Sequence, residues 1–175
     1  HFTDEPGHGF IVIVDDCSTD STKDYLAWLQ KQPEAKRIKI ITNSVNMGRS
    51  YSRNYGNKEA QGDVLMVLDA DDLALPKRAQ ITADKFKDGC DYFYGSAVSI
   101  DAVGRKIKEL PADVFDLDTA LKERANRIVH STTAYRKEIA LKYPHPDGEA
   151  ARLGMDDWTL QLHMAIDGIK FDFTP

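Results

Sequence analysis

Carboxylates gather directly after a short apolar stretch in the middle of the chain. The residues from Val64 to Leu68 are all apolar, and Asp69, Asp71 and Asp72 follow them with one alanine between. Five apolar residues in a row are typical of a strand that is buried on both faces. Three like charges within four residues repel one another unless water or a cation neutralises them. The pattern favours a metal that holds a phosphate group, although a solvated acidic turn before the next helix fits the same residues.

A second pair of carboxylates follows another apolar stretch near the start of the chain. It comes directly after Phe10 to Val14, whose residues are mostly β-branched and favour a strand. The carboxyl ends of parallel strands meet at one edge of a sheet, which is where open α/β sheets bind ligands. We therefore expect one acidic pocket there. It would contain Asp15, Asp16, Asp69, Asp71 and Asp72.

Two arginines could supply the opposite charge. Arg49 and Arg53 are four residues apart and share one face of a helix predicted at Arg49 to Gln61. The dipole of a helix does not favour a cation near its amino end. The pair therefore suits an anionic partner, although two solvated arginines fit the spacing as well.

Hydrophobic periodicity and turn residues predict the elements that position these side chains. Strands alternate with helices in the first half, which indicates a parallel sheet, and a predicted hairpin in the second half indicates an antiparallel extension. The predicted strands are Phe10 to Val14, Ile38 to Ile41, Val64 to Leu68, Asp91 to Ile100, Arg105 to Leu110, Arg127 to Tyr135 and Ile169 to Phe173. The predicted helices lie between Ser21 and Pro33, at Arg49 to Gln61, from Pro76 as first residue to Gly89, at Asp116 to Arg124 and at Met155 to Asp167, with a covering loop at Pro144 to Glu149.

Composition narrows the functional classes. A chain of 175 residues suits one domain with a real core. Its net charge of −5 argues against a protein that coats nucleic acid. No apolar run approaches the ~20 residues of a membrane span, so no transmembrane segment is expected. The two cysteines, Cys17 and Cys90, are too few for a disulfide framework and indicate a reducing compartment, so we expect a cytoplasmic location, at the membrane face or free of it.

Several short motifs agree in order and spacing with one known family. The motifs are Val14 to Asp20 (VDDCSTD), Asn46 to Gly48 (NMG), Ser52 to Gly56 (SRNYG), Gly62-Asp63, Leu68 to Asp72 (LDADD) with Pro76, Ile128 to Lys137 (IVHSTTAYRK) and Asp156 to Leu160 (DDWTL). Together they resemble the inverting family 2 glycosyltransferases. The resemblance implies an α/β protein with the GT-A fold, a Rossmann-like mixed sheet flanked by helices.

The resemblance also implies an activity. It describes residues 1–175 as a single domain, with a half that binds the nucleotide sugar at 10–76 and a half that holds the acceptor and the catalytic base at 77–175. The expected reaction moves a sugar from a nucleotide-diphospho-sugar, in the first place a UDP-sugar, to a hydroxyl of a carbohydrate, lipid-linked or other acceptor. Mn²⁺ or Mg²⁺ would stabilise the leaving diphosphate.

Roles in donor binding follow from the same resemblance. Asp16, beside Asp15, would bind the pyrimidine of the donor, with Arg53 nearby in the nucleotide pocket. Asp69 and Asp71 would form the D-x-D pair, with one facing the ribose and the other holding the metal.

Roles in catalysis are implied in the same way. Asp157 would be the general base that deprotonates the acceptor hydroxyl. Its neighbour Asp156 is one methylene shorter than the glutamate usual at that position, so the choice of base within the pair stays open. His130 would lie near the diphosphate, and a packed histidine is the alternative.

One departure from the family concerns the opening of the sequence. Family members begin with a strand and a helix that this sequence lacks, and His1 to Gly9 is polar and predicts a loop. The missing strand would lie between Phe10 to Val14 and Val64 to Leu68. Without it the two would border a slot ~10 Å wide. We expect upstream residues to fill this slot. The alternatives are a strand from another chain in an oligomer, or a collapsed sheet in which the two strands pair directly.

Two rival functions use the same carboxylates. A haloacid-dehalogenase-like phosphatase also has a strand that ends in D-x-D, but it requires Thr or Val where this sequence has Leu73. A non-catalytic module that binds a sugar or nucleotide would use Asp15 and Asp16 alone. It leaves the Asp69 and Asp157 segments without a role.

Overall fold

The computed structural model describes residues 9–175, so the predicted loop at residues 1–8 lies outside the described part. The helices and strands of the first half are β1 (Ile11–Asp15), α1 (Thr22–Leu29), the 3₁₀ helix η1 (Pro33–Arg37), β2 (Ile38–Thr42), α2 (Arg49–Glu59), β3 (Val64–Met66) and α3 (Arg78–Lys87). Those of the second half are β4 (Tyr92–Gly95), β5 (Ala97–Ile100), β6 (Lys106–Leu110), α4 (Leu117–Glu123), η2 (His130–Thr132), β7 (Ala134–Arg136), α5 (Lys137–Lys142), α6 (Glu149–Arg152), α7 (Asp156–Ile166) and β8 (Phe171–Thr174). The predicted α/β class is confirmed.

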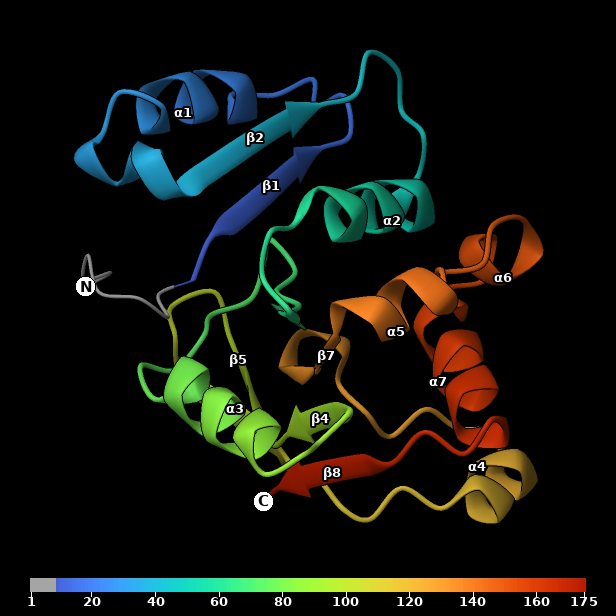
Figure 1. Ribbon diagram of the computed structural model, residues 1–175. Helices are drawn as coiled ribbons and strands as arrows, with labels where there is room; N and C mark the ends of the chain where they lie inside the picture. Colours follow the sequence, from blue (N-terminus) through green and yellow to red (C-terminus); the bar gives the residue numbers. More distant parts are fainter. Residues whose placement is uncertain (1–8) are drawn as a thin grey trace.

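The strands of the described part form three sheets. β1 and β2 pair in parallel, β5 and β6 form an antiparallel hairpin, and a mixed sheet has the order β3-β7-β4-β8. In Figure 1 the β1-β2 pair lies beside α1 at the top and the four-stranded sheet lies below it. Helix α2 lies between them and contacts both β1 and α5. It therefore joins the two halves of the molecule.

β1 and β3, the strands that were expected to flank a slot, lie in different sheets. Within residues 9–175, β1 pairs only with β2, and β3 only with β7, so each has one edge without a strand partner. The two strands do not pair directly with each other. What occupies the space between them stays a prediction.

The main core lies between the four-stranded sheet and helices α5 and α7. Tyr92 and Tyr135 from adjacent strands stack with ring centroids 5.7 Å apart, and Phe171 packs on Tyr92 at 4.5 Å. Leu160 and Met164 of α7 are fully buried against this aromatic layer. Because the core fixes α7, it also fixes the two aspartates in the first turn of that helix. No helix of the described residues is both long and apolar enough to span a membrane.

Two strand predictions were wrong in extent. The strand from Val64 is only three residues long, and Met66 and Leu68 are 39% and 49% exposed, so it is not buried on both faces. The strand predicted from Asp91 breaks at Ser96, and the part after the break, β5, pairs with β6 in a separate sheet instead of staying in the sheet of β4.

The segment from Arg127 to Tyr135 differs most from its prediction. Most of it is not a strand, because the hydroxyls of Thr132 and Thr133 donate to the carbonyls three residues before them and close the turn η2. Such local bonds compete with a sheet ladder. Pro76 also lies two residues before the start of α3 rather than at its first position. The short helices α5 and α6 were not predicted.

Candidate active site

A single guanidinium joins two distant acidic segments. Arg53 of α2 donates from Nη2 to Asp69 Oδ1 at 2.9 Å and from Nη1 to Asp156 Oδ2 at 2.7 Å. Asp69 lies just after β3, and Asp156 is the first residue of α7. The expected anionic partner of the arginine pair is therefore a carboxylate of the protein itself. This bridge brings the D-x-D segment and the D-D segment into one site.

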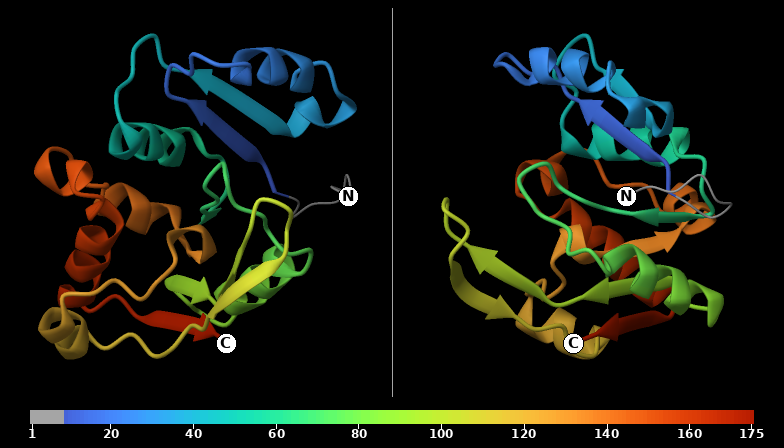
Figure 2. Two further views of the ribbon diagram at one scale, coloured as in Figure 1. Left: turned by 180° about the vertical axis from the view of Figure 1, so that it is seen from behind. Right: turned by 90° about the vertical axis from the view of Figure 1, so that its left-hand side faces the viewer.

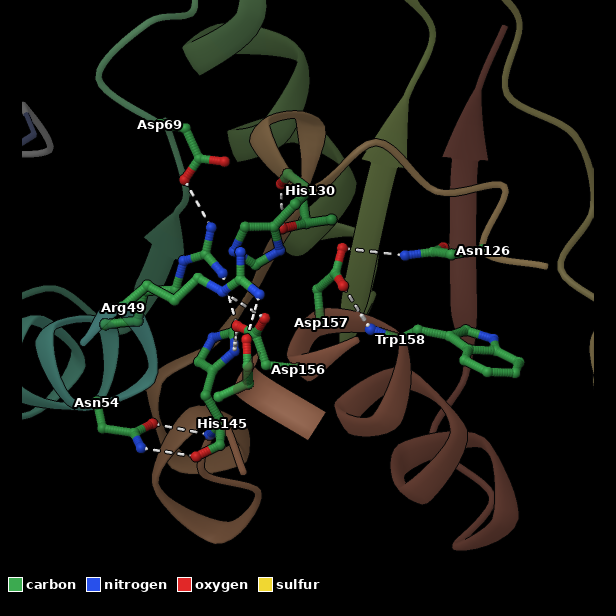
Figure 3. Close-up of polar contacts among 12 residues, drawn as sticks. Arg49, Asn54, Asp69, Asn126, His130, His145, Asp156, Asp157 and Trp158 are labelled. Carbon is green, nitrogen blue, oxygen red and sulfur yellow. Dashed lines mark hydrogen bonds and ion pairs between the residues drawn. The ribbon is translucent and has the colours of Figure 1, made fainter. Parts of the chain in front are cut away.

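Asp156 is the most enclosed carboxylate of the site. It is 1% exposed and also accepts from Arg49 Nε at 2.8 Å, as Figure 3 shows. Burial alone would raise its pKa, but the His145 ring 3.6 Å away and the charges of Arg53 and Arg49 bring the pKa far below the ordinary value. Asp156 is therefore charged, and both of its oxygens are held by arginines.

Asp157 lies in a different environment although it is the next residue. Its Oδ2 accepts from Asn126 Nδ2 at 3.0 Å and its Oδ1 from the Trp158 N–H at 2.8 Å. Burial, together with the charge of Asp156, raises its pKa above the ordinary value. A carboxylate with a raised pKa and no ion pair among residues 9–175 suits proton transfer better than Asp156 does.

The D-x-D segment leaves one carboxylate open to solvent. Asp69 is held by Arg53, and its N–H donates to Ser131 Oγ at 3.0 Å. Asp71 is exposed in the turn that follows. No cluster of three His, Cys, Asp or Glu residues suited to a metal occurs in the described part of the chain. Asp69 and Asp71 fit a divalent cation of the Mg²⁺ type, which takes one or two carboxylates and completes its shell with phosphate oxygens and water.

The pair at the end of β1 is held by other partners. Asp16 accepts from Asn43 Nδ2 at 2.7 Å and from the N–H groups of Met47 and Gly48 at 2.8 and 2.7 Å. Burial opposes ionisation, but these donors outweigh it and lower the pKa of Asp16. Asp15 is buried, its Oδ1 accepts from the Ser18 N–H, and its Oδ2 has no hydrogen-bond partner.

The carboxylates expected in one acidic pocket are thus held by different partners, and their convergence on one ligand stays a prediction. Asp15 and Asp16 bind the loops that follow β1 and β2, whereas Asp69 turns to Arg53 and Asp71 faces solvent. Helix α2 contacts both groups of partners, because Asn43 Nδ2 donates to Ser52 Oγ and the next residue, Arg53, donates to Asp69.

Two buried histidines adjoin the arginine bridge. The rings of His130 and His145 meet edge to face at 5.3 Å, and among residues 9–175 their ring nitrogens have no hydrogen-bond partner within 3.5 Å, since His145 Nδ1 lies 3.6 Å from Asp156 Oδ2. Burial, together with the charges of Arg53 and His145, lowers the pKa of His130 to about 3. His130 is therefore a neutral, packed ring in this state, as in the alternative considered for it.

Two side chains of the site were missed in the sequence. Asn54 clamps the backbone of His145 with two hydrogen bonds, at 2.9 and 2.8 Å, and so ties the 143–148 loop to α2. Asn126 contacts Asp157 from a loop with no regular pattern. Only Asn54 had a signal, since it lies next to Arg53 in the SRNYG motif.

Comparisons with known proteins identify the family and the fold. A family model described as "Glycosyl transferase family 2" matches residues 10–143. An uncharacterized glycosyltransferase of Methanocaldococcus jannaschii is 26% identical over 167 residues, which cover 93% of this chain and 56% of the relative. One of Nostoc sp. is 33% identical over 146 residues, which cover 75% of this chain and 43% of the relative. The chain thus spans about half the length of these curated relatives.

A solved structure supports the fold. The mannosyltransferase PcManGT of Pyrobaculum calidifontis, in complex with GDP-Man and Mn²⁺, superposes with a TM-score of 0.64 at 16% identity. The match covers 95% of this chain and 45% of that one. The expected GT-A fold is confirmed.

Proposed function

This chain belongs to glycosyl transferase family 2, and we propose that it transfers a sugar from a nucleotide-diphospho-sugar to an acceptor hydroxyl with inversion. A UDP-sugar is the first donor to test. The observation that carries the proposal is the Arg53 bridge. Through Arg53, Asp69 on the proposed donor side is joined to Asp156, the first residue of the helix that also bears the proposed base.

Asp157 is the proposed general base. It takes the proton of the acceptor hydroxyl while the acceptor oxygen attacks the anomeric carbon from the face opposite the diphosphate. Its raised pKa favours proton uptake, whereas Asp156 is neutralised by two arginines and holds the start of α7 in place. The choice between the two neighbours therefore falls on Asp157.

The donor side is assigned to the ends of β1 and β3. Asp16, which is held by Asn43, Met47 and Gly48, would bind an N–H of the nucleobase, and Asp15 Oδ2 is a second acceptor without a hydrogen-bond partner among residues 9–175. Asp69 and Asp71 would hold Mn²⁺ or Mg²⁺ together with the diphosphate. When bound, the cation offsets the negative charge that develops on the leaving diphosphate. Arg53 and His130 would line this side.

A donor panel tests the proposal. The protein is incubated with nucleotide sugars of several bases and sugars, with and without Mn²⁺, and release of nucleoside diphosphate is measured. We expect release from at least one donor with Mn²⁺, and its loss in Asp157→Asn. Asp118→Asn is the matched control, because Asp118 is an exposed first-turn aspartate of another helix, α4.

Two outcomes contradict the proposal. The first is that no donor in the panel releases nucleoside diphosphate. The second is release of phosphate from simple esters, which would favour the phosphatase that shares the D-x-D pattern.

A further inference from the structure

A pocket lies between the amino end of α2 and helix α6. Its volume is about 430 Å³, and its lining comes from Met47 to Tyr51 and from four residues of the segment 147–152. In Figure 1 and in the left view of Figure 2, α6 lies beside the start of α2, and Arg49 donates to the carbonyl of Ala151 across the gap. Pockets of about 300–1,000 Å³ are the size that binds small molecules. The pocket is separate from the carboxylates of the proposed transfer, which belong to other parts of the described chain.

The backbone of α2 presents donors to this pocket. No side chain caps the helix, and the N–H groups of Arg49, Ser50 and Tyr51 have no acceptor among residues 9–175. The first N–H groups of a helix point away from its body and favour an anion, phosphate above all. A free helix start is common, so the case for a ligand depends on the side chains around it.

The hydroxyl of Ser50 is an independent sign of a ligand. Ser50 lines the pocket and is only 2% exposed, and its Oγ is buried without a hydrogen-bond partner among residues 9–175. A buried hydroxyl without a partner is costly, and most such groups bind a protein atom, a water or a ligand. Because the hydroxyl belongs to the same helical turn as the free N–H groups, one anion can accept from both.

Arginines give the pocket a positive charge. Arg152 is exposed and has no ion pair within residues 9–175, so its guanidinium is available to a ligand. Arg49 is 46% exposed and also holds Asp156 (Figure 3). Two arginines against one aspartate, Asp147, leave the lining with a net charge of +1. Arginine binds phosphate and carboxylate oxygens through its planar fork.

The number of donors favours phosphate over carboxylate. Three N–H groups, the Ser50 hydroxyl and the Arg152 guanidinium are available in the pocket. A carboxylate has two oxygens to accept from them, whereas a phosphate monoester has three strong acceptor oxygens. Met47 and Tyr51 add apolar surface, against which the carbon body of a phosphate ester can pack.

We propose that this pocket binds a phosphate group, at a site separate from the one proposed for the donor diphosphate. The N–H groups of Arg49 to Tyr51 and the hydroxyl of Ser50 donate to its oxygens, and Arg152 offsets its charge. The phosphate is either the free anion or part of a small ester.

Amide NMR tests the site in the absence of donor and divalent cation. The labelled chain is titrated with inorganic phosphate and with glucose 1-phosphate, and with sodium chloride of equal ionic strength as the control. We expect the amide signals of Arg49, Ser50 and Tyr51 to shift together and to saturate with either phosphate but not with chloride. Equal dissociation constants identify the free anion as the ligand. A constant for glucose 1-phosphate that is lower by about threefold or more identifies an ester.

Substitutions separate the site from the general charge of the protein. Arg152→Gln should raise the dissociation constant about fivefold, whereas Arg105→Gln, an exposed arginine of the β5-β6 hairpin outside the pocket, should change it less than about twofold. Asp147→Asn should lower the constant, because it removes the only negative charge of the lining. Ser50→Ala should raise it about threefold with no fall in the urea midpoint, because the hydroxyl has no partner within residues 9–175 to lose.

The contrary results are distinct from failure of the proposed transfer, since no donor is present. Shifts that do not saturate, or that chloride reproduces, overturn the phosphate site. Shifts at Arg53 and Asp69 in place of the first turn of α2 assign phosphate to the proposed donor side and also overturn it. So does an equal loss of affinity in Arg152→Gln and Arg105→Gln, or a Ser50→Ala protein that binds phosphate like wild type.

Discussion

The adjacent aspartates at the start of α7 should respond to neutralisation in opposite ways. We predict that Asp156→Asn lowers the stability of the fold, whereas Asp157→Asn preserves stability and removes catalysis. The two substitutions are chemically identical and one residue apart. Any difference between them therefore reports the environment that the structure gives each carboxylate.

The magnitude for Asp156 follows from its partners. It accepts one bond from Arg49 and one from Arg53, at 2.8 and 2.7 Å. A hydrogen bond to a charged group contributes ~1.5–3 kcal/mol, and an ion left buried without its partner costs more. Arg49 is 46% exposed, so water replaces much of its share. We expect Asp156→Asn to lower the free energy of unfolding by about 3 kcal/mol. A domain typically has ~5–15 kcal/mol, so the variant should remain folded.

The expectation for Asp157 has the opposite sign. Its pKa is raised, so the fold disfavours its charged form, and removal of the charge costs nothing on that account. We expect the free energy of unfolding of Asp157→Asn to stay within ~1 kcal/mol of wild type or to rise. Loss of a general base should lower kcat by about 10²–10⁴.

Urea unfolding at neutral pH measures both proteins. With a slope of about 2 kcal/mol per molar, the midpoint of Asp156→Asn should fall by roughly 1.5 M. The midpoint of Asp157→Asn should stay near wild type, with nucleoside diphosphate release assayed in parallel. If Asp157→Asn is the unstable protein, or if Asp156→Asn is stable and inactive, the assignment within the pair must be exchanged.

Three further predictions concern the donor side. Asp71→Asn should abolish turnover with an unchanged unfolding midpoint, because Asp71 is exposed and its proposed role is to hold the cation; full activity of wild type in excess chelator would contradict this. His130, with a pKa of about 3, should show no ring protonation by NMR between pH 5 and 8, and because the unfolded chain binds that proton near pH 6.5, it should make the fold less stable as pH falls from there toward 3. Asp16→Asn should destabilise the fold most at neutral pH, and the gap to wild type in urea should narrow below about pH 4, because a carboxylate with a lowered pKa stabilises the fold only while it is ionised; a gap independent of pH would refute this.

Elements with a strong local pattern were predicted well. The β-branched run at β1 and the apolar stripe and stop glycine of α7 place both elements within two residues of the structure. The segment around His130 was not, because its Ser and Thr side chains can bond either to their own turn or to a neighbouring strand. In the structure the hydroxyls bond to their own turn, and the segment meets the residue after β3 only through its backbone, where the Val67 N–H donates to the carbonyl of Thr133.

Sequence and structure both indicate that one edge of β1 could accept another strand, but neither shows whether it does so in solution. Four apolar residues in β1, Ile11 to Val14, predict a strand covered on both faces, yet each is only partly buried. A strand with one unpaired edge and incompletely covered apolar residues is open to further pairing. Protection of the β1 amides in hydrogen exchange would show whether that edge is paired in solution, and fast exchange along it would show that it is open.

The site shows why motif spacing predicts candidates better than roles. Spacing located Asp69, Asp156 and Asp157, because each lies at the end or the start of a regular element. Spacing could not show that Asp156 forms ion pairs with two arginines, because the Arg53 contact joins residues that are 103 apart in sequence. The free energy of a carboxylate depends on which charges surround it after folding, and adjacent residues on a helix point to different surroundings. The proposed choice of base therefore depends on the position of α2, the helix whose arginines bind Asp156 and leave Asp157 to Asn126.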